Sequence, residues 1–354
     1  MEIGGHRRRR TTAVVPASAR RAAADRGWLR RVARGLNGLV PFGVPPGIGR
    51  RRVGDAAPRL MLFVGLLLGL APAAWPGEGV AVTDFLGREI ELDAPAERIV
   101  ALAPHLVENL YTAGAGEALV GAVSHSDYPA AARALPEVGG YTSVSLEAVV
   151  ALDPDLVVAW ASGDGGPRAT RERFATLGIP VYVDRPRRLD DVARAIVDLG
   201  RLAGHADTAA AAARRFRAGI ETLGRRYADR APVSVFYQVW DEPLQTLGRD
   251  QFVGQLIRLC GGRNIFADVA TLAPKVSIES VLVRDPEVIV ASGMGDERPD
   301  WLDDWRDWPG LQAVENDHLF FVAPDIIQRA TMRVLDGATT LCRQLESVRR
   351  DKGR

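Results

Sequence analysis

Two stretches of the chain carry the same pattern of polar and apolar positions. Val144–Trp160 reads VSLEAVVALDPDLVVAW and Val276–Ser292 reads VSIESVLVRDPEVIVAS, with eight of seventeen aligned positions identical. In each copy a serine comes before a short segment that contains a glutamate, and an Asp-Pro pair follows that segment. An uninterrupted run of apolar residues then ends the copy. Serine favours helix N-caps, proline ends helices, and continuous apolar runs suit buried strands of parallel sheets. The repeat therefore predicts two sister units, each with a short helix that leads into a buried strand.

Further apolar runs predict strands that alternate with helices. The strands are predicted at residues 98–103, 181–183, 233–239 and 318–322, and a helix at 105–113. The segment from His205 to Tyr227 is rich in alanine and arginine, has no proline, and is long enough for about six helical turns. Strands that alternate with helices indicate parallel sheets, whose ligands bind beyond the strand ends. We expect an α/β fold of two Rossmann-like lobes with parallel sheets, joined by a single long α-helix.

The N-terminal region predicts export. Leu60–Ala74 is apolar and uncharged, shorter than the roughly 20 residues that span a bilayer, and fits the hydrophobic core of a signal peptide. Residues 1–59 have little apolar surface to bury, which predicts a disordered or mis-annotated extension. The remainder divides into an N-terminal lobe at 81–204, a linker helix at 205–230 and a C-terminal lobe at 231–350. We expect a periplasmic protein, secreted through this signal peptide.

Composition narrows the class further. The 354 residues are 47% hydrophobic and 25% charged, as in ordinary globular proteins, and the formal net charge is +1. The longest arginine runs, Arg7–Arg10 and Arg50–Arg52, precede the apolar stretch, so the predicted mature chain is acidic and nucleic acid is a poor partner. Cys260 and Cys342 predict one disulfide in an oxidising compartment, with two buried free thiols as the alternative. Neither has a Cys or His partner at ligand spacing, so we predict no metal site on them.

Several segments resemble a known family. They are SHSDYP at 124–129, the stretch from Val138 through Trp160, LCGGRNIF at 259–266 and the Leu-Cys pair at 341–342. These segments are similar to periplasmic cobalamin-binding proteins of the ABC-importer substrate-binding family. Those proteins belong to the helical-linker class, which also serves ferric siderophores and haem. The resemblance extends from about Asp84 to Leu345 and implies a corrinoid ligand, cobalamin, delivered to an ABC permease dimer in the inner membrane.

The resemblance also implies ligand-binding residues. In the family, aromatic side chains hold the corrinoid between the lobes, and the matching positions here are Tyr128, Tyr141, Trp160 and Trp240. Aromatic rings suit a corrin, which is a wide and largely apolar disc fringed with amides, because each buries a large flat area. Arg329 matches a cleft arginine that could donate to ligand amides or phosphate, with a surface ion pair as the alternative. Ala273 departs from the family, which has a ligand-facing tryptophan at this position.

The two repeats place one glutamate each at equivalent positions. Glu147 and Glu279 should project from the same end of the molecule, and in the family this pair docks onto arginines of the permease. Two separated carboxylates can dock a roughly two-fold symmetric partner. The alternative is that each glutamate only favours the positive end of its helix dipole.

The alternatives to a corrinoid carrier are weaker. A ferric siderophore or haem protein of the same class would use arginines such as Arg168, Arg329 and Arg333. A zinc- or manganese-binding importer component would need ligands such as His105, His125 and Asp325. The predicted mature chain has four scattered histidines, no P-loop and no GxGxxG after a strand, so we expect no enzyme, no resident cofactor, and a monomer.

Overall fold

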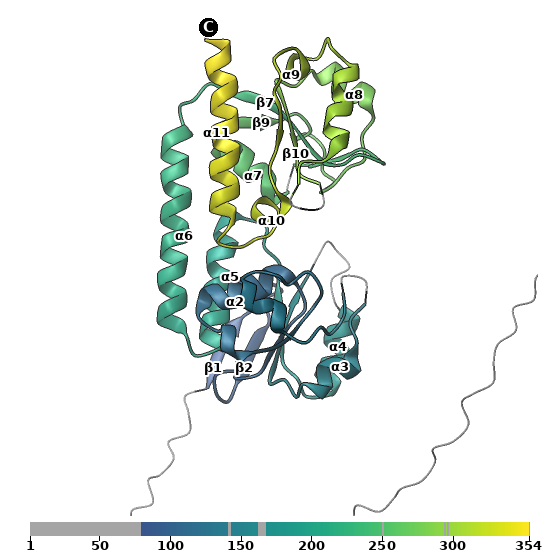
Figure 1. Cartoon of the computed structure of the whole chain (residues 1–354). Coiled ribbons are helices and arrows are strands. Elements are labelled where there is room, and N and C mark those ends of the chain that lie inside the picture. Colours follow the sequence, from purple (N-terminus) through teal and green to yellow (C-terminus); the bar gives the residue numbers. More distant parts are fainter. Residues whose placement is uncertain are drawn as a thin grey trace, which may run out of the picture. The chain divides into compact units, whose positions relative to one another are not determined.

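A computed structural model describes residues 79–140, 143–161, 168–249, 251–293, 295 and 297–353. All the elements described here belong to one compact unit, Ala74–Arg354 (Figure 1). The predicted N-terminal extension and the signal-peptide core at 60–74 lie outside the described residues. No helix in the described ranges is both long and apolar enough to cross a membrane.

The first lobe is built on a four-stranded parallel sheet with the order β4-β3-β5-β6. An antiparallel hairpin precedes this sheet, and helices alternate with its strands. The strands are β1 (Val80–Thr83), β2 (Glu89–Leu92), β3 (Ile99–Ala101), β4 (Leu119–Ala122), β5 (Leu156–Trp160) and β6 (Val181–Asp184), and the helices are α2 (Pro104–Ala113), α3 (Leu146–Ala151) and α4 (Arg168–Thr176), with short 3-10 turns at Gly116–Ala118 and Ala130–Ala134. The parallel strands are apolar runs buried on both faces, which is why their pattern is continuous rather than alternating.

The second lobe repeats this topology. Its parallel strands have the order β9-β7-β10-β11, so both lobes follow the order 2-1-3-4 when strands are numbered along the chain; the short β8 adds an antiparallel edge to β7. The strands are β7 (Val233–Trp240), β8 (Gln245–Thr246), β9 (Gly262–Asn264), β10 (Val288–Ala291) and β11 (Leu319–Phe321), and the helices are α7 (Phe252–Leu259), α8 (Ile278–Arg284), α9 (Gln312–Glu315), α10 (Pro324–Ile327) and α11 (Val334–Lys352), with a 3-10 segment at Asp300–Asp307.

The sequence repeat gives matching local structures. Ser145 Oγ accepts a hydrogen bond from the amide of Ala148 at the start of α3, and Ser277 Oγ accepts one from Ser280 at the start of α8. The aspartate of each Asp-Pro pair is left-handed, with φ of 46° at Asp153 and 42° at Asp285. Aspartate tolerates this conformation better than most residues, and the proline after it prevents a return to helix. Each short helix therefore ends in the same way before its buried strand.

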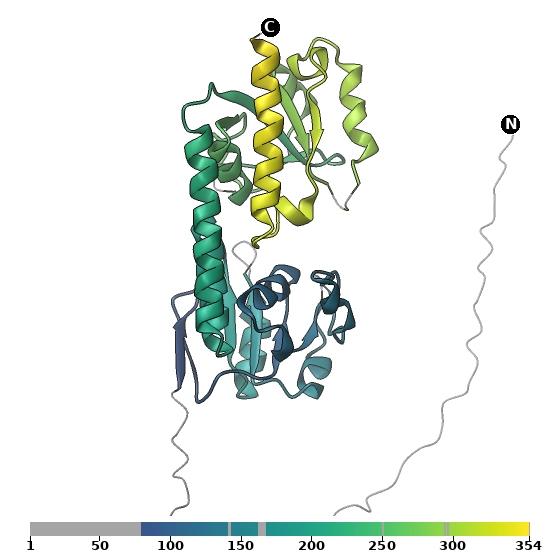
Figure 2. The ribbon, with the colours of Figure 1, turned by 60° about the vertical axis from the view of Figure 1, so that its left-hand side comes forward.

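One long helix, α6 (Ala206–Tyr227), joins the lobes along the chain, and a second helix, α5 (Leu189–Leu202), packs beside it. The bounds of α6 lie within the predicted linker range. Helix α6 contacts α2 of the first lobe and both α7 and α11 of the second, and it runs beside both lobes (Figure 2). The predicted fold class, two similar α/β lobes bridged by a long helix, is confirmed.

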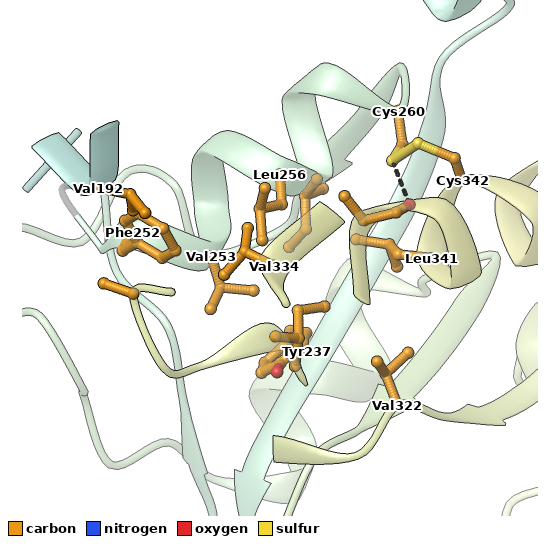
Figure 3. Close-up of a cluster of buried hydrophobic side chains, with 14 of the residues drawn as sticks. Val192, Tyr237, Phe252, Val253, Leu256, Cys260, Val322, Val334, Leu341 and Cys342 are labelled. Carbon is orange, nitrogen blue, oxygen red and sulfur yellow. Dashed lines mark hydrogen bonds between the residues drawn. A yellow bond between two sulfur atoms is a disulfide. The ribbon is translucent and has the colours of Figure 1, made fainter. Parts of the chain in front are cut away.

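The largest apolar core reaches from α5 into the second lobe. Val192 of α5 lies in one cluster with Phe252 and Leu256 of α7 and with Leu341 of α11 (Figure 3). The predicted disulfide joins Cys260 to Cys342 inside this cluster, and both residues are fully buried. Because α7 is fixed to α11 by a covalent bond and to α5 by packing, its position relative to the first lobe is strongly constrained.

Candidate ligand-binding cleft

A cavity of about 1520 Å³ lies beyond the carboxyl ends of all four parallel strands of the first lobe. Residues 102–105 follow β3, residues 123–125 follow β4, Trp160 and Ala161 end β5, and residues 185–188 follow β6, and each of these segments lines the cavity. This is the edge of a parallel sheet where α/β proteins bind ligands, because loops from several strands converge there.

The second lobe closes the opposite side. Its lining residues come from α7 and the loop before it, from 270–273, and from the segment after α10; they are Arg249, Gln251, Phe252, Gln255, Arg258, residues 270–273, Gln328, Arg329 and Ala330. Cavities for drug-sized ligands are about 300–1,000 Å³. The larger volume here suits a ligand of more than drug size.

Trp160 lines the cavity and packs against a buried polar pair, His105 and Asp184. His105, in the first turn of α2, has its Nε2 2.9 Å from Asp184 Oδ2 at the end of β6, and both side chains are buried. The Trp160 indole packs edge-to-face on the His105 ring, with the centroids 5.4 Å apart, and remains 37% exposed. The hydrogen-bonded pair therefore holds the His105 ring in place against the indole, and the exposed part of the indole presents apolar surface to the cavity.

Arg329 lies at the cavity wall and bridges the lobes by ion pairs. It contacts Asp325 at 2.8 Å, Glu108 of α2 at 3.1 Å and Asp127 at 3.4 Å. Arg333 reaches the same Glu108 carboxylate at 3.3 Å. Burial raises the pKa of Glu108 above its usual value, although the two arginines act in the opposite direction. Arg329 therefore forms ion pairs, as in the alternative to a ligand contact given above. A ligand group that binds the Arg329 guanidinium would have to compete with these three carboxylates.

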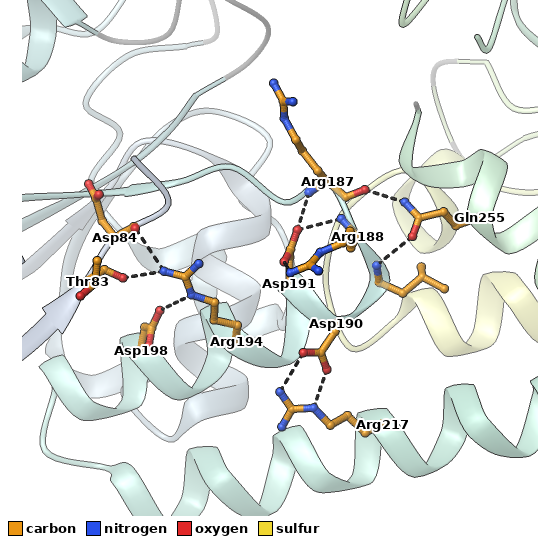
Figure 4. Close-up of polar contacts among 11 residues, drawn as sticks. Thr83, Asp84, Arg187, Arg188, Asp190, Asp191, Arg194, Asp198, Arg217 and Gln255 are labelled. Atoms are coloured by element: carbon orange, nitrogen blue, oxygen red, sulfur yellow. Dashed lines mark hydrogen bonds and ion pairs between the residues drawn. The ribbon is translucent and has the colours of Figure 1, made fainter. Parts of the chain in front are cut away.

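The first-lobe edge of the cavity is tied to α7 through one glutamine. Gln255 donates from Nε2 to the carbonyl of Arg187 at 2.5 Å, and its Oε1 accepts from the amide of Leu189 at 3.3 Å (Figure 4). Asp191 Oδ2 accepts from the backbone amides of Arg187 and Arg188, each at 2.8 Å. These bonds fix the loop between β6 and α5 against the second lobe.

The predicted ligand-binding residues occupy different places. Trp160 and Arg329 line the cavity. Tyr128 and Trp240 are not among the residues that line the cavity. The Arg333 guanidinium carbon lies 4.2 Å from the centroid of the Tyr128 ring, and Trp240 Nε1 donates a hydrogen bond to the Glu242 carbonyl. Tyr141 lies outside the described residues. Contact of these side chains with a ligand stays a prediction.

Apart from Arg329, sequence reasoning did not single out the arginines that line this cleft. Seven arginines line it, against one carboxylate among its described lining residues, that of Asp191. Five of the seven come from two places. The RPRR run at 185–188 directly after β6, which a strand-end search could have found, supplies three, and Arg249 and Arg258 around α7, which carry no comparable signal, supply two. Ala273 lines the cavity, so the position where the family has tryptophan lies in its wall and carries no ring.

The residues of the metal alternative are engaged differently. His105 pairs with Asp184, His125 lines the cavity, and Asp325 pairs with Arg329. Over the described ranges there is no group of three or more His, Cys, Asp or Glu side chains that could hold a metal ion. The side chain of Arg168, named for the siderophore alternative, lies outside the described part.

Glu147 and Glu279 occupy equivalent positions on the two lobes. Each lies in the first turn of its helix, α3 or α8, and each is exposed. The backbone amide of Glu279 and the Ser277 hydroxyl hold the pKa of the Glu279 carboxyl below its usual value. Both geometries suit a helix-dipole role, and both leave the carboxylates open to a partner, so docking stays a prediction.

Two similar lobes that enclose a large cleft at their strand ends define a class of proteins that capture a ligand between domains. Residues 99–326 match the family described as periplasmic binding protein. The chain belongs to this family.

Several relatives share most of its length. A vitamin B12-binding protein of Vibrio campbellii is 35% identical over 260 residues, which cover 73% of this chain and 93% of that protein. One of Yersinia pestis is 35% identical over 253 residues, covering 72% and 88%. The crystal structure of the periplasmic vitamin B12 binding protein BtuF of Vibrio cholerae superposes with a TM-score of 0.65 at 35% identity, covering 72% of this chain and 98% of that one. The heme-binding protein RhuT from Roseiflexus, with a TM-score of 0.64 and 24% identity, shares the fold.

Proposed function

We propose that this protein is an exported, non-enzymatic carrier that captures a corrinoid, cobalamin, in the cleft between its lobes and delivers it to an ABC importer. The observation that carries the proposal is the cavity of about 1520 Å³ between two lobes whose sequence is 35% identical to vitamin B12-binding proteins over nearly their whole length. A corrin with its side chains needs a site larger than that of most small ligands.

The cleft surface fits such a ligand in chemistry as well as in size. Phe85, Trp160, Phe252 and Leu272 supply apolar surface for the disc. Gln251 and the arginines supply donors for the amides at its rim.

Delivery and export complete the proposal. Glu147 and Glu279 dock the two lobes onto a roughly symmetric permease dimer, and the protein acts as a monomer with no resident cofactor. The apolar stretch at 60–74 directs export to the periplasm. In this proposal the lobes span 81–204 and 231–350, and the linker helix spans 205–230.

A ferric siderophore or haem is the second candidate, and the arginines of the cleft favour it. Seven guanidinium groups around one cavity suit an anionic ligand better than a neutral disc. The carrier fold is shared with a heme-binding protein, so fold alone does not separate the candidates.

The test is calorimetric titration of the purified protein with cyanocobalamin, and in parallel with ferric enterobactin, an anionic siderophore complex, and with haemin. We expect saturable binding of one cyanocobalamin per chain and a weaker or absent response to the other two. The Trp160→Ala variant serves as the site control and should weaken cyanocobalamin binding. Tight binding of ferric enterobactin or haemin, with no response to cyanocobalamin, would contradict the proposal and favour the second candidate.

A further inference from the structure

Four arginines form an uncompensated basic edge on the cleft. Arg187 and Arg188 come from the loop between β6 and α5, and Arg249 and Arg258 come from the second lobe, so each lobe contributes two. All four are exposed and line the same cavity. The carboxylate of Asp191 is the one negative charge among the described lining residues.

The other lining arginines differ because their charges have assigned partners. Arg194 pairs with Asp198 at 3.4 Å and lies over the Phe85 ring, and Arg329 pairs with three carboxylates. By contrast, the guanidinium groups of Arg187 and Arg258 have no ion-pair partner among the described residues. A cluster of charges that the fold leaves unpaired is a feature that a bound anion can satisfy.

The two remaining members of the edge are also open to a ligand. Arg249 donates to the carbonyls of Ala267 and Asp268, and the nearby Asp268 carboxylate is itself paired with Arg284 at 3.0 Å, so it offsets the Arg249 charge only in part. Arg188 reaches Asp191 at 3.5 Å with a side chain that is 77% exposed, which is a weak pair. The edge therefore carries a net positive charge even after Asp191 is counted.

Gln255 brings the two halves of the edge together. It binds the Arg187 carbonyl from the middle of α7, and Arg258 lies three residues further on, so both occupy one face of that helix. The side chain of Arg187 extends from this junction and makes none of the contacts drawn in Figure 4. Because the disulfide at Cys260 fixes the end of α7, the backbone at Arg258 is held in place beside this junction.

We propose that Arg187, Arg188, Arg249 and Arg258 form an anion subsite that holds a phosphate or carboxylate group on the rim of the bound ligand. The inference rests on the proposed function and deepens it: the cleft selects corrinoids that carry such an anion. A phosphodiester is present in a corrinoid with its nucleotide loop, and a carboxylate in an incompletely amidated one. Guanidinium groups bind both oxyanions in a bidentate way.

The experiment measures the affinity of the full-length protein for three probes: cyanocobalamin, which has the phosphodiester; cyanocobyric acid, which has a free carboxylate; and dicyanocobinamide, which has neither. We expect cyanocobalamin to bind about tenfold or more tightly than dicyanocobinamide, with the preference shrinking as sodium chloride rises from about 0.05 to about 0.5 M. The cyanocobyric acid arm shows whether a carboxylate substitutes for the phosphodiester.

The key variant is the double substitution Arg187→Gln/Arg258→Gln, with Arg263→Gln on exposed β9 as the charge-matched control outside the cavity. The double variant should lose about tenfold or more in affinity for the anionic probes and change by less than about twofold for dicyanocobinamide. The control should change none of them. An equal loss for all three probes, or no loss for any, would overturn the anion subsite.

Failure of the proposed function gives a different result. If the wild-type protein binds none of the corrinoids, the carrier proposal fails, and the subsite is then tested by thermal shift with pyrophosphate. Pyrophosphate should raise the Tm of the wild type and of Arg263→Gln, and should not raise that of the double variant. The same shift in all three proteins, or in none, refutes the subsite.

Discussion

Removal of the buried disulfide should cost a large share of the stability of the protein. The perturbation is the double substitution Cys260→Ala/Cys342→Ala, which opens the bond between the end of α7 and the middle of α11. The sequence separation is 82 residues, and in the chain-entropy treatment a closed loop of that length contributes about 4.5 kcal/mol. Both cysteines are fully buried in the largest core cluster, so each lost sulfur adds a small void that costs about 1 kcal/mol.

The assay is urea unfolding followed by tryptophan fluorescence and by circular dichroism. We expect the midpoint to fall by the equivalent of about 6–7 kcal/mol in the double variant, and the wild type with reductant to lose the loop contribution without the voids. Single Cys260→Ala and Cys342→Ala variants should lose nearly as much as the double variant, since either one opens the same loop. A loss below about 1 kcal/mol in both the double variant and the reduced wild type would refute this reasoning.

Three further predictions concern the cleft and its surroundings. Trp160→Ala should weaken cyanocobalamin binding by about 2–4 kcal/mol in calorimetry because the indole lines the cavity and is partly exposed to it; an unchanged affinity would contradict its place in the site. Glu147→Ala/Glu279→Ala should lower ligand uptake in cells at least about tenfold while affinity in calorimetry stays constant; equal loss of both would contradict a docking role. Burial raises the pKa of Glu108, so the folded state holds the Glu108 proton more tightly than the unfolded state does. The free energy of unfolding should therefore fall as pH rises from about 4.5 through the pKa of the folded state. The Glu108→Gln variant should lack this part of the pH dependence of the urea midpoint, and identical pH profiles for variant and wild type would contradict the reasoning.

The architecture was predictable because it rests on local patterns. The copies at Val144–Trp160 and Val276–Ser292 each contain a cap, a helix stop and a buried strand, and these signals act within a few residues. The proline-free segment at 205–227 likewise carries its own helix propensity. Two sister lobes and a linker helix follow from such features without any knowledge of distant contacts.

The site was only partly predictable because side-chain direction in loops depends on distant partners. Trp160 could be placed at the cavity since it ends a buried strand, where the direction of the chain is fixed. The partners of Arg329 include Glu108, which lies 221 residues earlier in the chain, and no local pattern announces that pair. Tyr128 lies under Arg333, also from the other lobe, so an aromatic residue in a suitable loop was no guide to the cavity lining.

The proportion of aromatic to basic residues that line the cleft differs most from the expectation based on the sequence. The resemblance led us to expect a wall of rings, whereas the described lining has three aromatic rings, Phe85, Trp160 and Phe252, apart from its two histidines, and seven arginines. The substitution at Ala273 removes a ring from the same wall. A cleft of this composition still provides apolar surface for a disc, and it adds positive charge at one edge.

The most direct test of the carrier account is a crystal structure of the protein grown with cyanocobalamin. We predict one corrin in the cavity between the lobes, with its face against Trp160 and its phosphodiester toward Arg187 and Arg258. A cleft without corrinoid in crystals that hold the ligand elsewhere, or a corrin that lies away from Trp160 and the second-lobe wall, would contradict the account.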